Sequence, residues 1–233
     1  MSELPVRTPM DVIAEALEPL SGRRVLDIGC GGGKLAQALT ARGARVTGID
    51  PQEEAVEAAR KAAPEAEFVQ GHGESLPFDE GEFDAAVFQN SLHHLPVEAM
   101  DAALSGAFSV VVPGGPVLVV EPLAEGTSFE LLRPIDDESA VRAAALAAVE
   151  KAIANGVALV RQDDFLRVSR FKSFEEAVAS KMAANPERAS LAAEIEPELR
   201  RRFAELAVVE DGLYRLDQPI RLFVLRRDVS ATT

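Results

Sequence analysis

The chain has 233 residues, of which 47% are apolar and 27% charged, and its formal net charge at pH 7 is −14. This composition is typical of a globular protein with a sizeable core, and it argues against a disordered chain. The strong acidic charge argues against nucleic acid as a partner. We find no secretory signal and no apolar run long enough to span a membrane, and a single cysteine cannot form an internal disulfide, so we expect a cytoplasmic protein.

The first half of the chain alternates between short apolar runs and helical patterns, after a first helical pattern at 11–20. Strands are expected at 24–29, 44–50, 66–71, 83–90 and 116–122, and helices at 34–43, 51–64 and 97–111. Apolar strands separated by helices indicate a parallel sheet covered on both faces. Right-handed crossovers then bring the carboxyl ends of these strands to one edge of the sheet.

The pattern changes in the second half, where helices are expected at 136–156, 173–186 and 187–207. Residues 214–227 read as an antiparallel hairpin, with turn residues at 217–219 between two alternating runs. The helical block therefore reads as an insertion into one domain. The predicted fold class is α/β: a Rossmann-like, doubly wound, mainly parallel seven-stranded sheet with a C-terminal antiparallel hairpin and a helical lid insertion.

A cluster of glycines marks the junction between the first strand and the first crossover helix, in the stretch VLDIGCGGG. Glycine there lets the backbone approach a ligand closely. A dinucleotide fingerprint would need its third glycine at Lys34, and no P-loop pattern follows, so neither a nicotinamide cofactor nor a P-loop nucleotide is favoured. Asp50 ends the second strand, where a carboxylate can bind the two hydroxyls of a ribose. In an ordinary α/β domain, Asp50 could merely cap a helix.

Taken together, VLDIGCGGG, VTGID, GESLPFDEGEFDAAVFQNSLHHL and VVPGGPVLVVEP resemble the motifs of class I S-adenosylmethionine-dependent methyltransferases, especially the small-molecule group called type 11. The resemblance implies an enzyme that uses S-adenosylmethionine, releases S-adenosylhomocysteine and methylates an O, N, C or S atom of a small molecule. It also implies a single domain, divided into a lid helix (1–22), a cofactor-binding core (23–123), a helical substrate lid (124–205) and hairpin strands (206–227). A non-catalytic module that binds S-adenosylmethionine or S-adenosylhomocysteine is the alternative.

The resemblance assigns cofactor-binding residues to the loops that follow the strands. Glycines would line the methionyl and ribose parts, with one aspartate near the methionyl ammonium and another on the ribose hydroxyls. The adenine loop has a histidine where the family usually has Asp or Asn, and a nearby glutamate is a substitute. The residues expected to bind the cofactor are Asp27, Gly29, Cys30, Gly31, Gly33, Asp50, Pro51, His72, Gly73, Glu74 and Gln89.

His93 and His94 follow the fourth strand and are the candidates for a general base, which methyl transfer needs only if the acceptor is protonated. One of them could equally point into the core or cap a helix. Glu121 is at the end of the fifth strand, where the resemblance implies a position near the substrate, although Glu121 could equally only start the next loop. No metal site and no oligomeric state is predicted. Five acids of the insertion could attract a cationic substrate or simply be solvated: Asp136, Asp137, Glu138, Asp163 and Asp164.

Overall fold

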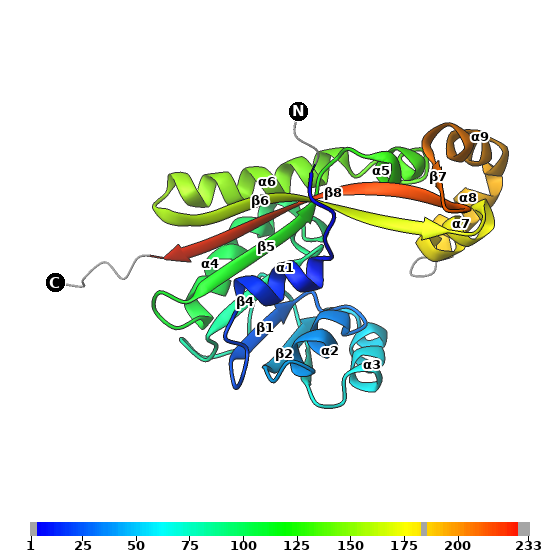
Figure 1. The fold of residues 1–233 in the computed structure, drawn as a ribbon. Helices are drawn as coiled ribbons and strands as arrows, with labels where there is room; N and C mark the ends of the chain where they lie inside the picture. The colour runs from blue at the N-terminus through cyan, green and yellow to red at the C-terminus, as the bar shows by residue number, and fades with distance from the viewer. Residues whose placement is uncertain (1–3, 183–185, 228–233) are drawn as a thin grey trace.

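Eight strands form one mixed sheet in the computed structural model of the chain, which describes residues 4–182 and 186–227 (Figure 1). The strand order is β3-β2-β1-β4-β5-β8-β6, and β7 pairs with β8. The parallel strands are β1 (Arg24–Ile28), β2 (Arg45–Asp50), β3 (Glu67–Gln70), β4 (Ala85–Gln89) and β5 (Pro116–Pro122). The antiparallel strands are β6 (Val157–Phe171), β7 (Val208–Glu210) and β8 (Leu213–Arg227). The α/β fold with its C-terminal antiparallel strands is therefore confirmed, but the sheet in the described ranges has eight strands and not the predicted seven.

Helices cover both faces of the sheet. Their bounds are α1 (Pro9–Ala16), α2 (Lys34–Thr40), α3 (Glu53–Ala62), α4 (Met100–Val110), α5 (Thr127–Leu132), α6 (Ser139–Ala154), α7 (Phe174–Met182), α8 (Pro186–Glu194) and α9 (Glu196–Leu206), with the short 3-10 helices η1 (Leu92–His94) and η2 (Val97–Ala99). One buried apolar cluster joins α1, α2 and α3 to the sheet, and a second joins α4 and α6 to it. The residues of β5 are buried at every position, as expected of a parallel strand between two helical layers.

The N-terminal helix α1 belongs to the first of these layers (Figure 1). Val12 and Ile13 are buried in the same cluster as Leu39 of α2. Asp11 forms an ion pair with Arg42, just beyond the end of α2 that is remote from the glycine turn. The apolar side of α1 is thus used in the core, and the role of residues 1–22 as a lid over the cofactor edge stays a prediction.

The two long strands β6 and β8 correct the prediction for the second half. β6 lies inside 124–205, which the sequence predicts as helical, and it pairs with β8 along its whole length. No turn occurs at 217–219, because β8 continues through these residues as one strand, from Leu213 to Arg227. The turn of the C-terminal hairpin lies instead at Asp211 and Gly212, both with positive φ, between β7 and β8.

A proline inside β8 is accommodated by the side chain that precedes it. In an antiparallel ladder, the N–H and C=O of one residue point to the same neighbouring strand. The carbonyl of Pro219 accepts a hydrogen bond from Leu123 N at 2.9 Å, but Pro219 has no N–H to return. Gln218 Nε2 donates to the carbonyl of Leu123 at 2.9 Å in its place. The strand therefore tolerates a residue that normally signals a turn.

β6 and β8 extend past the parallel strands and carry α7, α8 and α9 at their far end (Figure 1). A third apolar cluster fills this region, and it contains Leu131 of α5, Phe171 of β6, Phe174 of α7 and Phe203 of α9. The predicted helices 136–156, 173–186 and 187–207 correspond to α6, α7 and the pair α8 and α9, although 183–185 lie outside the described residues. The inserted helices α7, α8 and α9 therefore pack against an extension of the sheet that β6 and β8 form.

Candidate functional site

The glycine turn follows β1 at the point where the strand order reverses between β2 and β4, the usual ligand site of an open α/β sheet. Two of its glycines are required by packing. Gly29 has φ +76°, and an added Cβ would overlap the side chain of Ser91. Gly33 has φ +76°, and its Cβ would lie 3.0 Å from Ala59 of α3. These two positions need glycine even without a ligand.

The middle of the turn, in contrast, faces open space. A Cβ added at Gly31 or Gly32 would meet no atom within 4 Å. Gly31 has φ +50°, whereas Gly32 has no positive φ that would demand glycine. The uncovered backbone of the turn is therefore at Gly31 and Gly32. The sequence names Gly31 but not Gly32 as a contact, because spacing alone does not separate packing glycines from exposed ones.

Asp50 ties the turn to the end of β2. Its carboxylate accepts a hydrogen bond from Gly31 N at 2.9 Å and another from Gln52 N at 3.0 Å. The side chain is only 8% exposed, at the margin of the turn. Each carboxylate oxygen keeps a further lone-pair direction after these bonds, so Asp50 can still accept from a ligand.

Asp27 lies beneath the same turn, in β1, and is 2% exposed. Its Oδ2 is buried and has no hydrogen-bond partner among the described residues. Burial, followed by the negative charge of Asp50, raises the pKa of Asp27 to about 7. A buried carboxylate oxygen without a partner is costly, and a cationic ligand group at this position would relieve that cost.

The predicted adenine-binding residues lie in the loop that follows β3. His72 is 67% exposed at its side chain, with its Nδ1 3.8 Å from Oε1 of Glu74. Gly73 lies close to Ile28 and Leu95, which explains the lack of a side chain there. Their contact with adenine stays a prediction.

Three other predicted positions lie near the turn. Pro51 is exposed and follows Asp50 directly, and Gln89 ends β4 and is half-buried. The thiol of Cys30 is buried, and its pKa is raised far above its ordinary value by burial and then by Asp27 and Asp50. A thiol of this kind is not a nucleophile at neutral pH.

Glu121 and His93 form the second half of the site. One oxygen of Glu121 accepts hydrogen bonds from Ser91 N at 3.1 Å and from Leu92 N at 2.9 Å. Its other oxygen contacts Nδ1 of His93. Glu121 and His93 are 1% and 4% exposed. Because an ionised carboxylate can only accept, Nδ1 of His93 carries the proton and Nε2 is the basic nitrogen.

The neighbouring residues differ from His93 in their surroundings. His94 is exposed, and its ring lies 4.1 Å from that of His93. Protein atoms packed around part of the His94 ring, and then a positive charge on His93, lower the pKa of His94 below its ordinary value although the side chain reaches the surface. Asn90 has φ +51°, and its Oδ1 is buried without a partner among the described residues. The sequence missed Asn90, although asparagine is enriched at such left-handed positions.

A cavity of about 200 Å³ opens beside this loop. Asn90, His93 and His94 contribute to its wall from the loop after β4, and Arg167 from β6. The sequence could not place Arg167 here, since it expects helices where β6 runs.

A group of possible metal ligands occurs at the cavity. Within the described ranges, His93, His94 and Glu138 each bring one ligand atom to within 4.8 Å of the others. Both oxygens of Glu138 already accept from arginines, at 2.7 Å from Arg142 and 2.8 Å from Arg188. Because these cations neutralise the carboxylate, we assign no metal ion to the group.

The acids that could attract a cationic substrate are paired as well. Asp164 forms two hydrogen bonds with Arg221, and Asp163 pairs with Arg161. The three acids at 136–138 form ion pairs with Arg188, Arg133 and Arg142. The acids therefore do not form an uncompensated negative patch.

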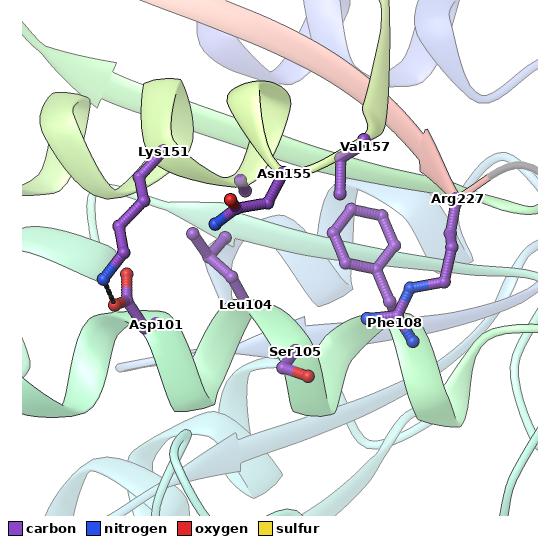
Figure 2. A pocket seen from close by; sticks show the side chains of 10 residues that line it. Asp101, Leu104, Ser105, Phe108, Lys151, Asn155, Val157 and Arg227 are labelled. Carbon is purple, nitrogen blue, oxygen red and sulfur yellow. Dashed lines mark hydrogen bonds and ion pairs between the residues drawn. The ribbon is translucent and has the colours of Figure 1, made fainter.

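A larger hollow, of about 530 Å³, lies between α4 and α6 (Figure 2). Arg227 stacks on Phe108 in it, with the guanidinium 5.3 Å from the ring centre, and Lys151 pairs with Asp101. Arg227 of the hollow directly follows Arg226, which pairs with Pro116, the first residue of β5. The hollow is therefore at the amino ends of the parallel strands, whereas the glycine turn is at their carboxyl ends. It is separate from the candidate site.

Comparisons with known proteins concern the family and the fold of the chain. Residues 25–115 match the family model described as a methyltransferase domain. The chain is 39% identical over 100 residues to an uncharacterized methyltransferase of Synechocystis, covering 43% of this chain and 47% of that protein. It is 40% identical over 114 residues to a ubiquinone biosynthesis O-methyltransferase of Alkalilimnicola ehrlichii, covering 47% and 45%. The match thus spans less than half the length of either relative.

Solved structures share the fold over nearly the whole chain. A proposed methyltransferase of Bacillus halodurans superposes with a TM-score of 0.66 and 24% identity, covering 95% of this chain and 99% of that one. The [4+2]-cyclase SpnF superposes with a TM-score of 0.65 and 21% identity, covering 95% and 81%. These likenesses concern the fold alone. Residues 25–115 therefore carry a methyltransferase domain, and the motifs and the fold are of the class I S-adenosylmethionine-dependent type.

Proposed function

We propose that the chain binds S-adenosylmethionine at the turn after β1 and transfers the methyl group to a small molecule in the cavity beside His93. The observation that carries the proposal is the contact between these two places. Gly29 of the turn packs directly against Ser91, and Ser91 lies two residues before His93. A ligand on the turn and a ligand in the cavity would therefore be neighbours, as in-line transfer requires.

The residues around the turn fit the cofactor. Asp27 has an unpaired buried oxygen suited to the methionyl ammonium, and Asp50 has acceptor capacity left for the ribose hydroxyls. Gly31 and Gly32 leave the backbone uncovered on the side where the ligand would lie. The bound cofactor supplies the reactive methyl group, so the protein must position the acceptor and exclude water.

His93 is the group best placed to act on the acceptor. With Nδ1 held by Glu121, Nε2 can accept a proton from a hydroxyl or amine as the acceptor is methylated. Glu121 is a positioning residue in this scheme, since it also fixes the loop through Ser91 and Leu92. This buried pair favours an enzyme over the binding-only module.

Two measurements test the proposal. Calorimetry with S-adenosylhomocysteine should show binding, and incubation with a metabolite panel and cofactor labelled in its methyl group should label at least one small molecule. Binding without any labelling would favour the non-catalytic alternative, which matters because a cyclase shares this fold. Absence of binding would reject both.

The proposal also covers the cellular location of the chain and the chemical class of its partner. Of the helices within the described residues, none is long and apolar enough to cross a membrane. The net charge of −14 supports a small molecule, not a nucleic acid, as the partner. A cytoplasmic location is consistent with the single buried cysteine.

A further inference from the structure

Arg167 is a cation without a counter-charge in the cavity wall. It comes from β6, and its Nε is buried with no hydrogen-bond partner in 4–182 and 186–227. Among the described residues, no carboxylate pairs with its guanidinium. Burial, and then the neighbouring charge of Arg142, lowers the pKa of Arg167 below its ordinary value. Arg167 is half-buried, and a partly desolvated guanidinium with a buried, unpartnered Nε would be stabilised by an anion beside it, so the arrangement indicates an anionic ligand.

The other two arginines of the cavity do not share this property. Arg142 donates to Glu138 from Nε and Nη2 and to the carbonyl of Leu123 from Nη1. Arg188 forms ion pairs with Asp136 and Glu138. Of the residues that the structure describes, three arginines and two acids line the cavity, in a chain whose net charge is −14. The unmatched positive charge belongs to Arg167.

A hydroxyl in the same cavity is also unpartnered. Ser128 is 2% exposed, and its Oγ has no hydrogen-bond partner among the described residues. A serine hydroxyl can donate to an anion beside an arginine. Two donors of different types, one from β6 and one from α5, thus lack hydrogen-bond partners among the described residues in the wall of one cavity.

The rest of the wall sets the size and character of the ligand. Phe129, Leu132 and Ile135 give the cavity an apolar side. Its volume of about 200 Å³ is somewhat above the ~150 Å³ that accommodates a benzene molecule. A ligand with one ring or a short chain fits this space.

Resting on the function proposed above, we infer that the methyl acceptor is a small carboxylic acid, whose carboxylate pairs with Arg167 and accepts from Ser128. The guanidinium presents paired donors that match a carboxylate, and the apolar wall receives the body of the acid. The atom to be methylated then lies toward His93, on the side of the cavity nearest the glycine turn.

The test uses two probes of equal size on the full chain saturated with S-adenosylhomocysteine. Benzoate should bind at least tenfold more tightly than benzamide in a calorimetric titration. Arg167→Met should abolish this preference and leave the affinity for S-adenosylhomocysteine within about twofold. Arg170→Met is the matched control, because Arg170 is an exposed arginine of the same strand that pairs with Glu210. It should keep the preference for benzoate.

Equal binding of the two probes, binding of neither, or an unchanged preference in Arg167→Met would overturn the inference. The initial titration with S-adenosylhomocysteine judges the proposed function separately, so the two failures can be told apart.

Thermal unfolding of the ligand-free variant adds a second criterion. Arg167→Met should raise the midpoint by at least about 2 °C, since an unpaired cation is removed. A fall of that size, or a variant that does not fold, would show that Arg167 is a structural cation and would also overturn the inference.

Discussion

Glu121, at the carboxyl end of β5, holds Nδ1 of His93, in the loop that follows the neighbouring strand β4, and both side chains are buried. The same carboxylate caps the backbone of this loop through Ser91 and Leu92. One side chain thus fixes both the loop and the imidazole that it carries. This arrangement distinguishes His93 from the adjacent His94, which is exposed.

His93→Gln should therefore lower kcat for methyl transfer by a factor of roughly 10²–10³, the usual loss when a general base is removed. His94→Gln is the matched control and should change kcat by less than about threefold, which corresponds to about 0.65 kcal/mol. The measurement is transfer from labelled cofactor to an acceptor found in the panel. Equal losses in the two variants would contradict the assignment of His93 as the base.

Glu121→Gln keeps an oxygen that can accept from Ser91 and Leu92, but it removes the charge beside His93. We expect kcat to fall by about one to two orders of magnitude, while the acceptor KM changes by less than about threefold. The affinity for S-adenosylhomocysteine should also stay near that of the parent. A rise in KM with constant kcat would indicate instead that Glu121 serves substrate binding.

The four glycines of the turn should respond differently to alanine. Gly32→Ala should leave the unfolding midpoint within about 2 °C of the parent and weaken S-adenosylhomocysteine binding at least tenfold, because its Cβ would occupy only the space of the ligand. Gly29→Ala should instead lower the free energy of unfolding by about 3 kcal/mol or more, through its clash with Ser91 and its positive φ. Unchanged ligand affinity in Gly32→Ala would place the cofactor elsewhere.

Asp27 should make the stability of the ligand-free protein depend on pH. Its pKa of about 7 in the folded chain exceeds the ordinary value of 3.8, so the folded state binds this proton more tightly than the unfolded state. Stability from this group is therefore complete below about pH 4 and is lost as the pH rises toward 7. Relative to Asp27→Asn, the parent should lose roughly 2–4 kcal/mol of unfolding free energy between pH 4.5 and 7.5.

Urea unfolding of the two proteins across this range measures the difference directly, and all other titrating groups are common to both. A difference that stays constant with pH would show that Asp27 is already ionised in the folded protein at pH 4.5.

Asp50→Asn should weaken S-adenosylhomocysteine binding by about 1.5–3 kcal/mol, since the charged acceptor of the ribose hydroxyls is lost. Glu53→Gln is the control, an exposed acid three residues away in the first turn of α3. Calorimetry on both variants provides the comparison. Affinity of Asp50→Asn within twofold of the parent would mean that Asp50 only holds Gly31 and Gln52.

The parallel half of the fold could be predicted from the sequence because its signals are local. Most of the strands from β1 to β5 are short apolar runs, and the glycine turn needs positive φ at Gly29, Gly31 and Gly33, which lie within five consecutive residues. The second half could not be predicted in the same way. Residues 157–171 carry many charges, and their strand conformation depends on pairing with β8. Residues 217–219 have the composition of a turn, yet partners on both sides keep them extended.

The sequence by itself determined the prediction of a nucleoside-type ligand at the turn after the first strand, with Asp50 beside it and, through the family resemblance, Asp27. Only the tertiary structure decided which histidine is held by Glu121, which acids are already neutralised, and that Arg167 has no counter-charge among the described residues. Backbone conformation at a glycine turn is a property of covalent neighbours. Burial, pairing and desolvation depend on side chains that folding brings together from strands far apart in the chain.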